Sequence, residues 1–129
     1  MNGLTVTLPW PSADLSPNSR NKWAMIRATK AAKHYACYMT KSLMGPLRIV
    51  SGSWVGPIAV HTCYHPPANY RFDDDGLNSR MKAAWDGIAM ALGIDDNLFR
   101  HTYQRGDKQP PHGCVIVTLT PASIKGAGK

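Results

Sequence analysis

Five of the eight acidic residues in the chain bracket one predicted helix. Asp73, Asp74 and Asp75 stand directly before it, and Asp95 and Asp96 directly after it. Adjacent carboxylates repel one another, so a group this dense is either fully solvated or binds a hard cation such as Mg²⁺ or Mn²⁺ through its oxygens. The residue types therefore predict metal-assisted chemistry. Helix capping is the alternative for any single aspartate.

Within this group, the expected side-chain directions favour Asp73 and Asp75 as the pair that binds a metal ion. If the segment before the helix is extended, Asp73 and Asp75 point the same way and can share a metal ion. On the helix that follows, Lys82 and Asp86 fall on the same face as Asp75. Lys82 can there stabilise charge that develops on a phosphate group. The alternative is an ordinary ion pair between Lys82 and Asp86 on a solvated helix face.

The length of the predicted helix separates the two groups of aspartates. A helix over residues 77–92 is about 24 Å long, whereas the four residues after it reach back only about 13 Å. If Asp75 and Asp96 serve one site, either Gly87 kinks the helix or a two-fold partner donates Asp96 across a dimer interface. Donation by the partner is the preferred hypothesis.

Hydrophobic periodicity and turn residues predict an α/β (α+β) fold, in which a small mixed sheet carries two main helices. The expected strands and helices, in chain order, cover residues 4–8, 21–44, 55–64, 77–92 and 114–120. Gly45 and Pro46 are expected to end the first helix, and Gly93 follows the second as its C′ residue. Pro57 predicts that its strand is at an edge or begins late. Residues 1–129 form a single predicted domain with a frayed tail from residue 123.

Charge is distributed unevenly along this basic chain, whose net charge is +7. Residues 1–72 hold eight Lys or Arg and one Asp, whereas residues 73–129 hold seven of each sign. One face of the first predicted helix collects the basic side chains Arg20, Arg27, Lys30, His34 and Lys41. Trp23 and Tyr38 lie among them, which is typical of a surface that follows a nucleic-acid backbone and stacks on bases. An ordinary solvated helix face is the alternative.

The remaining composition disfavours several classes of protein. Cys37, Cys63 and Cys114 are odd in number and widely spaced, which indicates reduced structural thiols. The five histidines show no metal-ligand spacing, and a catalytic Cys/His pair has little support. No apolar run approaches the roughly 20 residues of a membrane span, and residues 1–10 lack the pattern of a secretory signal. We therefore expect a cytoplasmic protein that needs no membrane and no small-molecule cofactor.

Several short motifs resemble the RusA family of Holliday junction resolvases, in the form carried by phages and prophages. They are LPWPS at 8–12, SPNSR at 16–20, RFDDD at 71–75, KAAWDGI at 82–88 and IDD at 94–96. The resemblance covers most of residues 4–120. Two positions depart from the family pattern: Gly76 replaces the usual Asn, and Lys82 lies farther from Asp75 than in the bacterial type.

The resemblance implies a homodimer that uses Mg²⁺ or Mn²⁺ to cut opposed strands of a four-way DNA junction by phosphodiester hydrolysis. It assigns metal binding and catalysis to Asp73, Asp75 and Asp96, with Lys82 assisting. The participation of Asp74 or Asp95, and the choice between one metal ion and two, stay open.

Phosphate contacts would position the junction without reading its sequence. The expected DNA-binding residues are Arg20, Arg27, Lys30, Lys41, Arg71 and Arg80. Two alternatives are retained. The first is a non-catalytic DNA-binding protein, in which the aspartates cap helices and balance charge. The second is a metal-dependent nuclease that acts on flaps or single strands.

Overall fold

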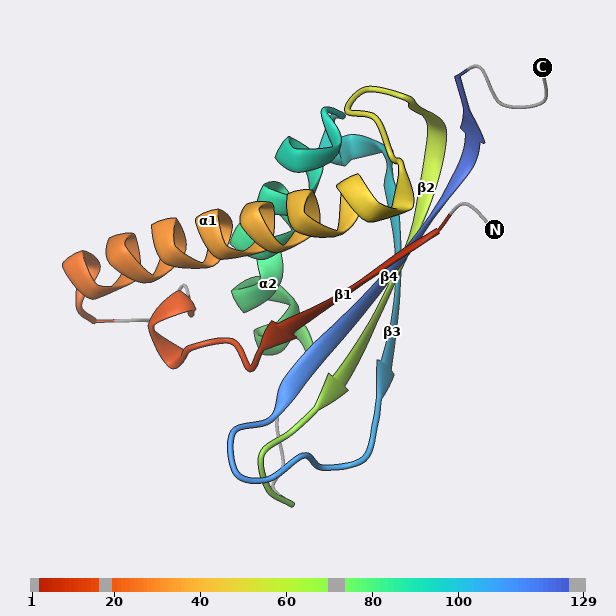
Figure 1. Ribbon diagram of the computed structural model, residues 1–129. Helices are drawn as coiled ribbons and strands as arrows, with labels where there is room; N and C mark the ends of the chain where they lie inside the picture. The colour runs from red at the N-terminus through yellow and green to blue at the C-terminus, as the bar shows by residue number, and fades with distance from the viewer. Residues whose placement is uncertain (1–2, 17–19, 70–73, 126–129) are drawn as a thin grey trace.

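Four strands form one mixed sheet in the order β1-β4-β2-β3, and two helices pack on one of its faces (Figure 1). The computed structural model describes residues 3–16, 20–69 and 74–125, and the side chains of residues 74 and 75 are outside that description. The elements are β1 (Leu4–Pro9), α1 (Lys22–Leu47), β2 (Trp54–His65), α2 (Asp74–Leu92), β3 (Phe99–Arg105) and β4 (Cys114–Ile124). The predicted fold class, a single α+β domain with two main helices, is confirmed.

The sheet combines two kinds of pairing. Strand β4 pairs antiparallel with β1 on one side and with β2 on the other, whereas β2 and β3 are parallel. Parallel neighbours need a crossover connection, and α2 supplies it between β2 and β3. The periodicity of the sequence did not predict β3. Its presence makes the sheet mixed and places a fourth strand beside α2.

Alternating side chains on the strands build the core against the helices. The inward residues on β1, β2 and β4 are fully or almost fully buried: Leu4, Val6, Leu8, Ile58, Val60, Tyr64, Val115, Val117 and Leu119. They meet the apolar stripe of α2, which consists of Leu77, Met81, Trp85, Ile88 and Leu92. Helix α2 is therefore anchored along its length, as its periodicity predicted. Within the described ranges, neither helix combines the length and the apolar character that a membrane span requires.

Gly87 marks the place where α1 and α2 cross. A Cβ atom built on Gly87 would lie 2.2 Å from the carbonyl oxygen of Lys33. Only a residue without a side chain allows the two helix backbones to approach this closely. Helix α2 is continuous from Asp74 to Leu92. We therefore attribute Gly87 to helix packing.

The end of α1 lies beyond the predicted one. The helix continues past Gly45 and Pro46 to Leu47, and Arg48 follows in a left-handed conformation with φ of 58°. The backbone N–H of Arg48 donates to the carbonyl of Gly45 at 3.0 Å. Proline in the last turn removes only one intrahelical hydrogen bond, so it does not stop the helix at Met44.

Two strand predictions also need correction. Pro57 lies in an interior strand, because β2 has β4 on one side and β3 on the other. Its position coincides with a register shift between Val55 and Ile58, where a strand tolerates proline. At the carboxyl end, β4 remains paired through Ile124, and Lys125 donates its N–H to Ser53 at 2.7 Å. The predicted frayed tail therefore does not begin at residue 123.

Candidate active site

A polar hollow of about 710 Å³ opens between α2 and β3. Helix α2 contributes Asn78, Ser79, Lys82, Trp85 and Asp86 to its wall. The opposite wall consists of Asp96 at the start of a short 3₁₀ helix, η2 (Asp96–Leu98), and of Phe99, His101 and Tyr103 from β3. Two of the four residues predicted to be catalytic, Lys82 and Asp96, thus line one hollow.

The turn after α2 determines which of the two adjacent aspartates lines the hollow. Gly93 has a φ of 69°, which ends the helix, and the N–H of Ile94 then donates to the carbonyl of Ala89 at 3.1 Å. The Asp95 carboxylate accepts the backbone N–H of Asn97 at 3.0 Å and thereby caps η2. Asp95 is therefore a helix cap, the alternative considered for any single aspartate, whereas Asp96 lines the hollow.

Asp96 lies beside Asp86, for which the sequence predicted only an ion pair with Lys82. Both carboxyl groups line the hollow, close enough to affect each other's ionisation. Burial raises the pKa of Asp86, and the proximity and negative charge of Asp96 raise it further, while the charges of Lys33 and Lys82 lower it. Two carboxyl groups this close need either a shared proton or a cation between them.

The contact between Asp96 and Asp86 forms within one chain. Asp86 lies six residues before the end of α2, which corresponds to about 9 Å of helix. The four residues after the helix therefore do turn back along it, within the reach estimated from the sequence. No partner chain is needed to bring Asp96 beside Lys82. The hypothesis that a partner brings Asp96 to Asp75 stays a prediction, because the side chain of Asp75 is outside the described residues.

The other predicted metal ligands are at the start of α2. Asp73 falls outside the described residues, and Asp74 and Asp75 begin the helix without described side chains. Within the described part of the chain, no group of three or more His, Cys, Asp or Glu side chains has the arrangement of a metal site. The assignment of Asp73 and Asp75 as metal ligands stays a prediction.

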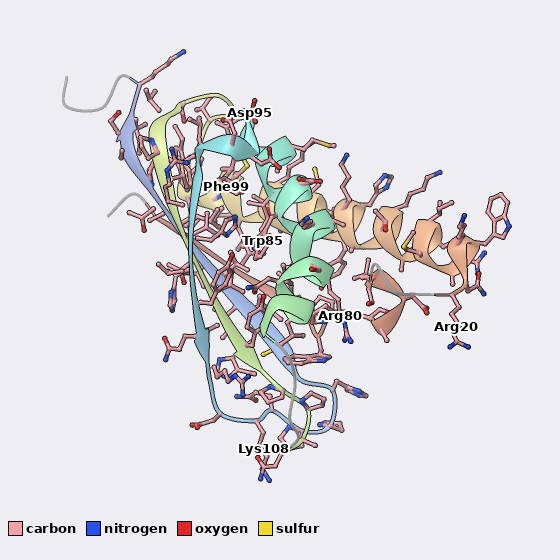
Figure 2. All side chains as sticks on the ribbon, turned by 180° about the vertical axis from the view of Figure 1, so that it is seen from behind. Arg20, Arg80, Trp85, Asp95, Phe99 and Lys108 are labelled. Atoms are coloured by element: carbon pink, nitrogen blue, oxygen red, sulfur yellow. The ribbon has the colours of Figure 1, made fainter. Side chains whose placement is uncertain are left out.

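The predicted DNA-binding residues divide into two environments. Arg27, Lys30 and Lys41 are exposed along α1, and Arg20 is exposed just before it. Arg80 is half-buried instead, and it lines an apolar pocket with Trp10 and Tyr35 on the α1 side of α2 (Figure 2). Its Nε is buried without a hydrogen-bond partner among the described residues. Arg71 is outside the described residues.

A cysteine and a histidine lie together on the face of the sheet away from the helices. The Cys63 Sγ is 3.4 Å from His65 Nε2, and His65 Nδ1 is 2.8 Å from the carbonyl oxygen of Asp107. Burial raises the pKa of the Cys63 thiol, and the charges of Cys114 and Asp107 raise it further. A thiol held protonated is a poor nucleophile, so the raised pKa disfavours Cys63 in that role. All three cysteines are free thiols.

A comparison with known proteins finds a relative in Xylella fastidiosa. No protein-family model matches the chain. A protein of Xylella fastidiosa, itself described only as uncharacterized, is 37% identical over 122 residues, which cover 90% of this chain and 75% of the relative. The two proteins belong to one family. The description of the Xylella protein names no activity, so the function is argued from the hollow itself.

The aromatic wall of the hollow was not predicted from the sequence. Phe99, His101 and Tyr103 share the helix-facing side of β3, and Trp85 approaches them from α2 (Figure 2). Burial lowers the pKa of His101, although the charge of Asp96 opposes the shift. Aromatic rings stand at every second residue from 99 to 103. This is the period of a strand and could have identified β3.

Proposed function

We propose that the chain is a metal-dependent endonuclease that resolves four-way DNA junctions in recombination and repair. The observation that carries the proposal is the meeting of Asp96, Asp86 and Lys82 in one open polar hollow. Carboxylates beside a lysine suit phosphodiester hydrolysis, because the carboxylates can hold a cation and the ammonium group can stabilise negative charge on the phosphate. The resemblance to RusA resolvases adds the substrate class.

The residues of the hollow fit a hard divalent cation. The negative charge of Asp96 raises the pKa of Asp86, and a cation between the two carboxylates would offset their repulsion. Oxygen atoms are the ligands that Mg²⁺ and Mn²⁺ prefer. Asp96 would hold the ion with Asp86 beside it, and Asp73 and Asp75 would complete the site across the dimer interface. When bound, the ion would activate water for attack on the phosphate.

The basic face of α1 would supply most of the affinity for DNA. Arg20, Arg27 and Lys30 are exposed, as is Lys41, and cationic side chains that neutralise phosphates release counterions. A four-way junction must be cut on two opposed strands, so a homodimer with two hollows belongs to the proposal. So does a cytoplasmic location, where the chromosome of a bacterium and the DNA of a phage are found.

Adjacent aspartates provide a matched test. We would measure cleavage of a labelled four-way junction in Mg²⁺ and in Mn²⁺ by the wild type, Asp96→Asn and Asp95→Asn, and follow binding in EDTA. Asp96→Asn should lose cleavage by at least about 100-fold and keep binding, because it removes charge from the hollow. Asp95→Asn should cut normally, since asparagine caps a helix as well as aspartate does.

The same experiment separates the alternatives. Tight binding without cleavage by any of the three proteins would favour the non-catalytic DNA-binding protein. Faster cleavage of a flap or a single strand than of the junction would favour a different nuclease. Equal cleavage by Asp96→Asn and the wild type would contradict the assignment of the hollow as the active site.

A further inference from the structure

The wall of the hollow on β3 is a row of aromatic rings that runs from the core to the surface. The Trp85 ring lies 4.2 Å from that of His101 between centroids, and the His101 ring lies 5.9 Å from that of Tyr103. The planes of His101 and Tyr103 differ by only 4°. Trp85 is 7% exposed and Tyr103 is 45% exposed. Tyr103, whose ring is also 6.1 Å from that of Trp85, is thus the most exposed of the three.

The strand backbone sets the direction of the Tyr103 side chain, and the rings of Trp85 and His101 lie next to it. Tyr103 is paired with Thr62 of β2, and His101 with Val60, in the parallel part of the sheet. Residues two apart on a strand share a face, so the ring of Tyr103 continues the direction of the His101 ring. A side chain that is already ordered loses less rotational entropy when it contacts a ligand. Tyr103 is thus suited to contact a flat ligand.

The charges in the same hollow indicate which flat ligand. Lys82 and Tyr103 line the same hollow. One bound molecule can therefore place an anion at the ammonium group and a flat ring on the tyrosine. A nucleotide combines a phosphate with a flat base in this way. Aromatic side chains stack on any base, because every base has an aromatic face.

We propose that Tyr103, supported by His101 and Trp85, stacks on an unpaired nucleobase next to the phosphate that is cut. The inference rests on the proposed function and narrows its substrate to DNA in which such a base is free. In an intact duplex both faces of a base are covered by its neighbours, whereas unstacked bases are found where strands diverge. Tyr103 would therefore be a specificity-determining residue that favours branched DNA over linear duplex.

The first arm of the test measures stacking without chemistry. A series of four-way junctions, each with one 2-aminopurine at a successive position around the branch, is titrated with the full-length protein in EDTA. The fluorescence of this base falls when it stacks. We expect quenching at one position next to the cut, lost in Tyr103→Leu and retained in Tyr103→Phe, because leucine fills space but has no flat ring.

The second arm compares affinities. Tyr103→Leu should bind the junction about 5- to 160-fold more weakly, the range for loss of one stacked base, and should bind linear duplex within about twofold of the wild type. Tyr35→Leu is the matched control, because Tyr35 is 46% exposed and lines a different pocket. It should leave both affinities and the quenching unchanged. Thermal unfolding confirms that each variant is folded, and if Tyr103→Leu does not fold, Tyr103→Met takes its place.

The two arms distinguish failure of this inference from failure of the proposed function. If Tyr103→Leu binds and quenches as the wild type does, the stacking role is overturned, even when the wild type cuts junctions. If quenching depends on Tyr103 but no metal supports cleavage, the stacking site stands and the nuclease proposal falls. An equal weakening of affinity for junction and linear duplex would also overturn the inference, because stacking on a free base predicts selectivity.

Discussion

The outer face of α1 and the hollow beside α2 carry charge in opposite ways. On α1 the side chains of Arg27, Lys30 and Lys41 are of one sign and exposed to solvent, where salt screens them. In the hollow, Asp86 and Asp96 lie beside Lys82, so charges of both signs share one small space. The first arrangement suits many weak, interchangeable contacts with DNA. The second suits a site in which the position of each group matters.

The aromatic residues of the two regions differ in the same way. Trp23 is 72% exposed and Tyr38 is 69% exposed on α1. Tyr103 forms the end of a row whose inner members are packed between α2 and β3. We therefore expect the rings on α1 to add affinity without selecting a DNA structure, and the ring of Tyr103 to select one.

The largest expected effect is on the cleavage rate, when one lysine of each region is replaced in turn. Lys82→Ala should lower the cleavage rate at saturating junction by about 100- to 1000-fold and change binding little, because it removes a cation beside the reacting phosphate. Lys30→Ala should leave that rate unchanged and weaken binding a few-fold. Single-turnover kinetics measures both. A weakening of binding in Lys82→Ala that matches its drop in rate would remove the distinction between the two regions.

The second-largest effect should be on the stability of the protein, at the place where α1 and α2 cross. Gly87→Ala would force a methyl group against the Lys33 carbonyl, so we expect destabilisation of about 1–3 kcal/mol by urea unfolding. Gly45→Ala is the control, since a Cβ there meets nothing within 4 Å. It should be neutral or stabilise by up to about 1 kcal/mol. Equal stabilities of the two variants would show that the helices can separate at Gly87.

Neutralising the outer face should change the response to salt. In the variant with Arg27, Lys30 and Lys41 replaced by Gln, the slope of log affinity against log salt should fall by about 0.9 for each phosphate that is no longer neutralised. Cleavage at saturating junction should be unchanged. Binding measured between low and moderate salt provides the slope. An unchanged slope would place the DNA on another face of the protein.

The smallest effect is expected at Asp95, whose replacement should lower stability but not cleavage, unlike that of Asp96. Asp95→Ala removes the acceptor that caps η2 and should cost about 1 kcal/mol of stability, with cleavage by the folded protein kept. Thermal unfolding and junction cleavage at low temperature are the measurements. A drop in cleavage as large as that of Asp96→Asn would show that the cap positions the active site as well as stabilising the turn.

Much of the fold could be predicted because its signals are local. The apolar stripe of α2 and the alternation in β1 and β4 each identify an element without reference to the rest of the chain. The sequence did not predict β3, because this strand lies at an edge of the sheet. Arg100, Thr102 and Gln104 face away from the helices, and Phe99 is the one buried residue of the strand. Its polar residues resemble those of a loop until the pairing with β2 is known.

By itself, the sequence determined both main helices, the strands other than β3, the net positive charge before residue 73 and the clustering of aspartates around one helix. Only the tertiary structure decided that Asp96 faces Asp86 while Asp95 caps η2, and that Tyr103 ends a row of rings from two elements. These outcomes depend on the left-handed turn at Gly93 and on the register of β3 against β2. Periodicity follows from the geometry of one element, whereas contacts between elements depend on how the turns and strand pairing orient them.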